Sequence, residues 1–149
     1  MVEEQKAPLR FQAAVSWDGD GAGRGTVSAR ETTVPIGGSK DLDGSGHGVN
    51  PEELLLSSVG ACFVATWAIF LKKLSIPYAS PSLRVSGELE KDPAGGFRMS
   101  SIDIAAIVPK ALADRRAEVE KTLSLAEKYC IISKVARAAM PVRVKIEEV

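Results

Sequence analysis

Cysteine and histidine are scarce in this sequence. Its 149 residues include two cysteines, Cys62 and Cys130, and one histidine, His47. These three side chains are too few for a tetrahedral zinc site unless carboxylates or a second chain complete it, so we expect no metal. We expect no other cofactor either. Two cysteines also cannot form the framework of a small disulfide-rich secreted protein, and the first residues, MVEEQKAPLR, lack the apolar stretch of a signal peptide. We therefore expect a cytoplasmic protein.

The sequence also lacks an excess of charge of either sign. Nineteen basic and nineteen acidic residues give a formal net charge of zero. Attraction to nucleic acid or to an anionic membrane surface requires an excess of positive charge. We expect neither nucleic acid nor a membrane among the partners of this protein.

The length predicts a single domain over residues 1–149, because the chain is too short for two ordinary domains. We divide it into a β-rich meander and loop at 1–49, a central helix at 50–75, and a hairpin, two helices and a terminal strand at 82–149. Separate groups of strands and helices are typical of the α+β class. The glycine-rich segment 37–49 is predicted to be a mobile surface loop.

Alternation of apolar and polar residues predicts the strands. The first, at 10–17, should have one buried face, and a change of inward face near Ser100 and Ser101 predicts a bulge in the hairpin. Strands are expected at 10–17, 25–31, 32–36, 83–89, 97–108 and 142–147, and the two later helices at 112–129 and 130–138.

The central helix has a well-marked start and an uncharged body. Asn50 can cap it, Pro51 suits its first position, and Glu53 can complete a capping box. The 18 residues from 54 to 71 carry no charge, which is the lower limit for a membrane span. We favour a buried helix, because serine, glycine and threonine lower the hydropathy of the segment and the predicted strands need a core to cover.

Apolar residues point all round this helix, so no face is suited to water. A subunit of 149 residues could hardly surround it alone. We therefore expect a homodimer in which a partner subunit packs against the helix.

Taken alone, neither cysteine is decisive. Cys62 lies in the apolar helix, where a lone cysteine is usually a small core residue. Cys130 comes at the start of a predicted helix, where N–H groups favour a thiolate, although a capping residue that faces the core is an equal alternative.

The residues around the two cysteines carry more information. Asn50-Pro51-Glu52-Glu53-Leu54-Leu55 precedes Ala61-Cys62-Phe63, and Ala126-Glu127-Lys128-Tyr129-Cys130 precedes Ile131-Ile132-Ser133-Lys134. With Trp17-Asp18-Gly19-Asp20 and Gly25-Thr26-Val27, these strings resemble the OsmC/Ohr family of peroxidases over nearly the whole chain. The resemblance implies an OsmC-like fold of two intertwined subunits. Each subunit would contribute a six-stranded sheet around central helices, with its strands in two antiparallel β-rich halves.

The resemblance also implies an activity, that of an antioxidant enzyme of the oxidative stress response. Cys62 would attack an organic hydroperoxide, release an alcohol and become a sulfenic acid. Cys130 would condense with Cys62 to form a redox-active disulfide, which an external dithiol would reopen. In the Ohr branch of the family this reductant is a lipoylated protein.

The family further supplies an arginine, held by the glutamate that matches Glu52, to activate the peroxidatic thiolate. Arg24 resembles the arginine position of the Ohr branch, whereas the OsmC branch places it in the loop where this chain has Lys40. We favour Arg24 because a guanidinium can hold Glu52 by two hydrogen bonds, although Arg24 as an ordinary solvated turn residue has nearly equal weight. The chain departs from many relatives at Ile131, where they have proline.

Two alternatives remain within the same fold, a thiol-dependent hydrolase and a module that binds apolar ligands. A hydrolase needs a base near Cys62, and the one histidine, His47, lies in the predicted loop.

Glu52 lies ten residues before Cys62 and about 15 Å from it along a straight helix. Glu52 should therefore serve the Cys62 of the partner subunit.

Overall fold

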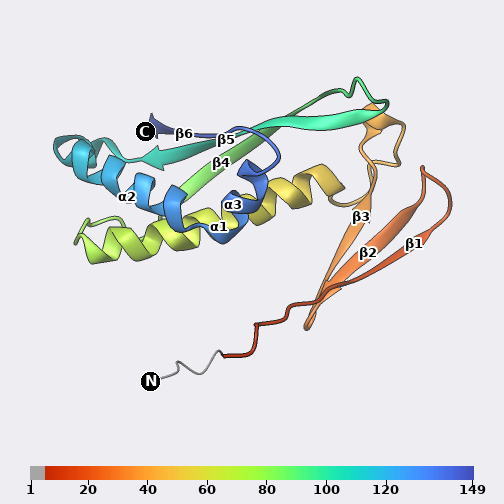
Figure 1. The fold of residues 1–149 in the computed structure, drawn as a ribbon, viewed down its shortest axis with the longest axis horizontal. Helices are drawn as coiled ribbons and strands as arrows, with labels where there is room; N and C mark the ends of the chain where they lie inside the picture. Colours follow the sequence, from red (N-terminus) through yellow and green to blue (C-terminus); the bar gives the residue numbers. More distant parts are fainter. Residues whose placement is uncertain (1–5) are drawn as a thin grey trace. The chain divides into compact units, whose positions relative to one another are not determined.

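A computed structural model describes residues 6–149, which form two compact units (Figure 1). The first unit ends at Pro51 and the second covers Glu52–Val149. Within the described residues each unit has one three-stranded sheet, and the three α-helices belong to the second. The α+β class predicted from the sequence is confirmed. The six strands of one chain form two sheets rather than one.

The N-terminal unit is an antiparallel meander of β1 (Ala14–Asp18), β2 (Arg24–Ala29) and β3 (Thr32–Gly37). Gly23 closes the β1–β2 turn with a hydrogen bond from its N–H to the Asp20 carbonyl, 2.9 Å long. A Cβ at this position would lie 2.1 Å from the carbonyl oxygen of Asp18, so the turn requires glycine.

Neither face of the first strand, β1, is buried, although the sequence predicts one buried face. All five residues of β1 are exposed, and Val15 and Trp17 keep 68% and 45% of their surface accessible. The strand is also shorter than predicted and begins at Ala14. The period-two pattern thus identifies the strand but not what covers it.

The glycine-rich segment after β3 is a loop, as predicted, and hydrogen bonds organise it. It contains one turn of 3-10 helix, η1 (Lys40–Leu42), which Ser39 caps by accepting a hydrogen bond from the Asp41 N–H. Val49 returns beside Ile36 in a single parallel bridge just before the central helix.

The second unit places three helices on one face of a sheet (Figure 1). In the sheet, β4 and β5 are antiparallel, and β6 pairs with β5 in parallel. The prediction that both β-rich halves are purely antiparallel is therefore wrong for this sheet. The parallel pairing arises because η2, α2 and α3 carry the chain back across the sheet between β5 and β6. The elements are α1 (Pro51–Lys73), β4 (Ser82–Lys91), β5 (Phe97–Val108), η2 (Lys110–Arg115), α2 (Arg116–Tyr129), α3 (Ile131–Arg137) and β6 (Val142–Glu148).

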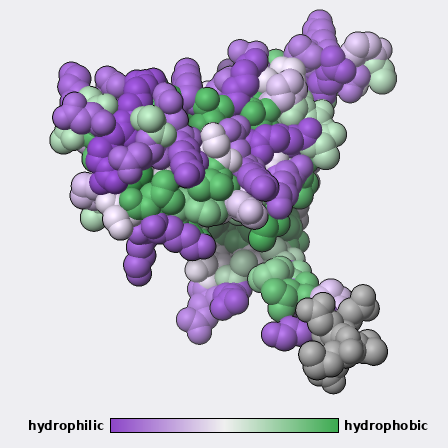
Figure 2. Space-filling model, turned by 60° about the vertical axis from the view of Figure 1, so that its left-hand side comes forward, coloured by the Kyte–Doolittle hydropathy of each residue, from purple (hydrophilic) through white to green (hydrophobic). Residues whose placement is uncertain are grey.

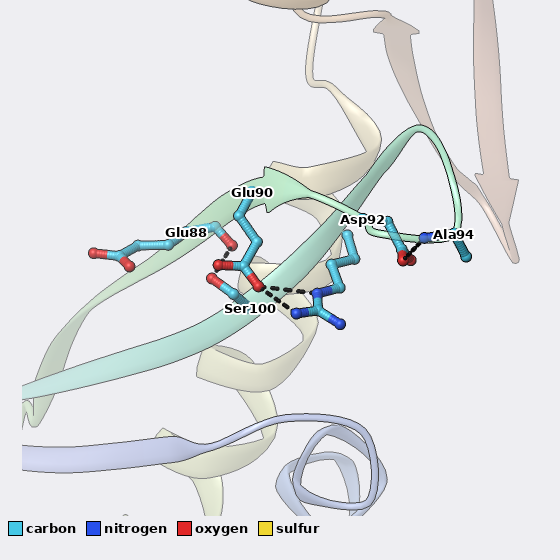
Figure 3. A network of polar contacts seen from close by, with 6 residues as sticks. Glu88, Glu90, Asp92, Ala94 and Ser100 are labelled. Carbon is cyan, nitrogen blue, oxygen red and sulfur yellow. Dashed lines mark hydrogen bonds and ion pairs between the residues drawn. The ribbon is translucent and has the colours of Figure 1, made fainter.

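The predicted bulge in the β4–β5 hairpin is confirmed. Glu88 pairs with Ser101 and Leu89 with Met99, which leaves Ser100 as the extra residue. Beyond the bulge Arg98 donates two hydrogen bonds to Glu90, and Asp92 accepts one from the Ala94 N–H (Figure 3).

The core of this unit lies between α1, α2 and the sheet. One stripe of α1 is buried at spacings of four residues, and Trp67 at its centre donates a hydrogen bond of 2.9 Å from Nε1 to the buried Thr122 hydroxyl of α2. Because the indole N–H is satisfied, the large ring can be fully buried. The buried apolar residues of α1, the sheet and α2 include Val59, Phe63, Trp67, Leu71, Ile102, Ile104, Val119, Leu123 and Ala126.

The rest of α1 is not covered within one chain. By length and composition α1 could cross a membrane, and only 22% of its most apolar 18-residue window is buried. Leu55 and Ile69 are among the exposed apolar residues, and hydrophobic side chains reach the surface in Figure 2. The buried stripe accounts for one face of the helix only.

Two helix boundaries differ from the prediction. The segment predicted as helix from residue 112 begins with the 3-10 turn η2, and α2 starts only at Arg116. The next helix, α3, starts at Ile131 rather than Cys130. Apolar spacing alone does not distinguish a 3-10 turn from the first turn of an α-helix.

Candidate active site

The second unit brings the two cysteines together although 68 positions separate them in the chain. Cys62 lies on α1 and is partly buried. Cys130 lies between α2 and α3 and is fully buried. The two thiols are hydrogen-bonded to one another and both are free.

Cys130 forms the corner between α2 and α3. It ends α2, where its N–H donates to the Ala126 carbonyl at 2.8 Å, and it caps α3, where its Sγ accepts a hydrogen bond from the Ser133 N–H at 3.4 Å. Of the two alternatives left open by the sequence, the structure therefore shows a capping residue that faces the core. The corner also directs the N–H groups at the start of α3 toward Cys62.

Hydrogen bonds hold the pKa of Cys62 below its ordinary value. Burial is the largest single influence and raises this pKa. Hydrogen bonding to the Ile132 backbone, the Cys130 thiol, the Ile131 backbone and the Thr66 side chain together outweighs it. Cys62 is therefore the sulfur that ionises more readily.

Cys130 has the opposite tendency. Burial raises its pKa above the ordinary value, and the hydrogen bond from the Ser133 N–H offsets this only in part. Because the Cys130 thiol donates to the Cys62 sulfur, ionisation of Cys62 also disfavours ionisation of Cys130. The pair is thus asymmetric, because the pKa of Cys62 is lowered and that of Cys130 is raised, so that a thiolate forms more readily at Cys62.

Glu52 lies in the first turn of α1, away from the cysteines. The helix runs without interruption from Pro51 to Lys73, so Glu52 and Cys62 of one chain cannot meet. One oxygen of Glu52, Oε2, is buried without a hydrogen-bond partner among the described residues. A buried carboxylate oxygen needs a donor, so this position is suited to a cation from elsewhere.

The two candidate cations lie in the N-terminal unit. Arg24 is the exposed first residue of β2, in register with Asp18 of β1 and Gly37 of β3. Lys40 is exposed in η1. Each is thus accessible to a carboxylate.

Part of the site was not predicted from the sequence. The Ile131 and Ile132 N–H groups and the Thr66 side chain contribute to the low pKa of Cys62. The four-residue spacing between Cys62 and Thr66 could have indicated a shared helix face. No sequence signal identifies backbone donors that arrive from a distant helix.

A cavity of about 400 Å³ lies between α1 and β4. Its lining includes Leu56, Gly60 and Val85 but not Cys62, so it is separate from the thiol pair. Over residues 6–149 there is also no cluster of three histidine, cysteine or acidic residues that could hold a metal.

Known proteins resemble this chain in sequence and in fold. The family described as OsmC-like protein matches residues 44–145, which include Glu52 and both cysteines. The chain belongs to the OsmC family. Organic hydroperoxide resistance protein-like 1 of Staphylococcus epidermidis is 28% identical to this OsmC-family chain over 129 residues, which are 87% of the chain and 91% of that protein.

Solved structures confirm the OsmC-like fold. An OsmC-like protein from Mycoplasma pneumoniae has a TM-score of 0.80 at 16% identity, covering 96% of this chain and 99% of its own. The organic hydroperoxide resistance protein OhrB of Bacillus subtilis has a TM-score of 0.69 at 24% identity, covering 92% and 98% respectively.

Proposed function

We propose that this OsmC-family protein is a thiol peroxidase that reduces organic hydroperoxides to alcohols. The observation that carries the proposal is the asymmetric thiol pair, in which the pKa of Cys62 is lowered and that of the adjacent Cys130 is raised. The relatives named for organic hydroperoxide resistance support the same chemistry. Two free thiols also fit a reducing cytoplasm.

The reaction proceeds in three balanced steps. The Cys62 thiolate attacks the distal oxygen of the hydroperoxide, the O–O bond breaks, and the alkoxide takes a proton to leave as an alcohol. The resulting Cys62 sulfenic acid then condenses with the Cys130 thiol, which forms the disulfide and releases water. An external dithiol, such as a lipoylated protein, reduces this disulfide by exchange and is itself oxidised.

Variants of the two cysteines test the assignment of roles. Cys62→Ser should abolish hydroperoxide reduction, because only this sulfur meets the peroxide. Cys130→Ser should allow one turnover and leave an oxidised Cys62, which mass spectrometry detects. Steady-state reduction by Cys62→Ser would overturn the proposal.

A cation paired with Glu52 would complete the site. The buried Oε2 of Glu52, which has no hydrogen-bond partner within residues 6–149, supports this role. A guanidinium suits the carboxylate better than an ammonium because it can donate two parallel hydrogen bonds. We assign the cation to Arg24. The positive charge would lower the pKa of Cys62 further when the site is assembled.

The active protein is proposed to be a homodimer whose two sites are shared. The exposed sides of α1 and β1 are apolar surfaces that a partner subunit can cover, which would remove them from water. Since α1 keeps Glu52 and Cys62 of one chain apart, Glu52 would act on the Cys62 of the partner subunit.

Subunit mixing tests this arrangement. Cys62→Ser and Glu52→Gln subunits, each impaired alone, should together form heterodimers with one working site. Native mass spectrometry verifies the mixed dimers. Activity no higher than that of the Glu52→Gln parent would contradict the shared site, and a monomeric protein would contradict the dimer itself.

The non-peroxidatic alternatives have less support. The unit at 52–149 contains no histidine, because the one histidine is His47, so this unit alone cannot place an imidazole base beside Cys62. A module that only binds apolar ligands would have no use for a thiol of lowered pKa. Turnover of an ester without loss of thiols, or ligand binding without oxidation of Cys62, would favour these alternatives.

A further inference from the structure

Thr66 lies one helical turn after Cys62, on the same face of α1. Its hydroxyl donates a hydrogen bond of 2.8 Å to the backbone carbonyl of Cys62. Side chains on a helix lean toward its N-terminus, so this hydroxyl lies beside the Cys62 side chain. Both residues are partly buried, which limits the access of water to the hydroxyl.

The Cys62 carbonyl does not depend on this hydrogen bond. In an α-helix the N–H of residue 66 already donates to the carbonyl of residue 62. The hydroxyl has one proton and can serve one acceptor at a time. A thiolate is charged, and charged acceptors make stronger hydrogen bonds than a carbonyl that is already paired.

We propose that Thr66 is a positioning residue whose hydroxyl turns from the Cys62 carbonyl to the Cys62 sulfur when the thiol ionises. The motion is a rotation about the Cβ–Oγ1 bond and leaves the helix intact. The hydroxyl then adds a donor from α1 itself to the N–H groups that α3 supplies. Cys130 is the titratable group that faces Cys62 from the corner of α2 and α3. The catalytic consequence rests on the proposed peroxidase function, in which this thiolate is the nucleophile.

Independent support comes from the acidity of Cys62. Hydrogen bonding with the Thr66 side chain is among the causes that lower the pKa of Cys62, so Oγ1 lies within reach of the sulfur as well as of the carbonyl. The hydroxyl thus has two acceptors on the same residue, as the proposed rotation requires.

Thr66→Val and Thr66→Ser test the proposal as a matched pair. Valine keeps the branched shape and removes the hydroxyl, whereas serine keeps the hydroxyl. The measurement is the rate of Cys62 alkylation by iodoacetamide across pH, with the modified peptide quantified by mass spectrometry. Below the pKa we expect Thr66→Val to react about threefold to tenfold more slowly, since fewer thiols are ionised and a more basic thiolate offsets only part of this loss.

The shape of the pH profile separates this role from a structural one. Thr66→Val should shift the midpoint to higher pH without lowering the plateau, and Thr66→Ser should keep the wild-type midpoint. An unchanged midpoint in Thr66→Val, or a lower plateau in both variants, would overturn the proposal. If Thr66→Val does not fold by circular dichroism, Thr66→Ala provides the same comparison.

A second readout links the inference to catalysis. The kcat/KM for cumene hydroperoxide should fall in Thr66→Val by the same factor as the alkylation rate at that pH. If wild-type protein reduces no hydroperoxide, the proposed function fails, while the alkylation profile still decides the role of Thr66.

Discussion

Replacing Ile131 with proline should remove one donor from Cys62 and leave α3 in place. Ile131 is the first residue of α3, a position that proline tolerates because its N–H is not needed within the helix. The preceding Cys130 has φ −64° and ψ 113°, an extended conformation that a following proline permits. Ile131 is 69% exposed, so we expect the free energy of unfolding to stay within about 1 kcal/mol of wild type.

The same substitution should raise the pKa of Cys62. A hydrogen bond to a charged group contributes about 1.5–3 kcal/mol, and about 1.4 kcal/mol is a tenfold change in an acid dissociation constant. The Ile132 N–H and the Thr66 hydroxyl remain and recover part of the loss. We therefore expect the pKa to rise by about one unit. At pH values below this pKa the rate of hydroperoxide reduction should fall by about threefold to tenfold, and it should recover as the pH rises through the pKa.

The assay compares Ile131→Pro with Ile131→Ala, which loses the same side chain but keeps the N–H. Cys62 alkylation is followed across pH in both variants and in wild type. Only Ile131→Pro should show the shifted midpoint. Coincident profiles for the two variants would refute the idea that the Ile131 N–H stabilises the thiolate.

Two further predictions concern the cation and the core. Arg24→Ala should raise the pKa of Cys62, measured by alkylation of the protein across pH, whereas Lys40→Ala should not. The reverse pattern would assign the activating cation to Lys40. Thr122→Val leaves the buried Trp67 N–H without its acceptor, so the free energy of unfolding measured by urea titration should fall by about 1–3 kcal/mol. A fall of less than about 0.5 kcal/mol would contradict the role of Thr122 as this acceptor.

Local signals in the sequence predict much of the second unit. Proline at position 51 correctly indicates the start of α1, because proline fits the first turn of a helix. The change of face at Ser100 and Ser101 correctly indicates the bulge, because an extra residue reverses the alternation of a strand. Such features depend on neighbours in sequence, which is why a single chain suffices to find them.

Features that depend on distant partners were not predictable in the same way. The alternation in β6 indicates a strand, but the parallel pairing with β5 follows from how the intervening helices cross the sheet. The proximity of Cys62 and Cys130 came from the family resemblance, not from spacing. The sequence associates the N–H groups at the start of α3 with Cys130. In the fold the Ser133 N–H does bond to Cys130, but the Ile131 and Ile132 N–H groups lower the pKa of Cys62.

The most direct test counts the free thiols of the reduced protein before and after one equivalent of cumene hydroperoxide per chain. Each subunit begins with the two free thiols of Cys62 and Cys130. We expect both thiols to disappear together, with release of one cumyl alcohol and a loss of about 2 Da that maps to a Cys62–Cys130 disulfide. Two thiols per subunit still titratable, with the hydroperoxide unconsumed, would contradict it.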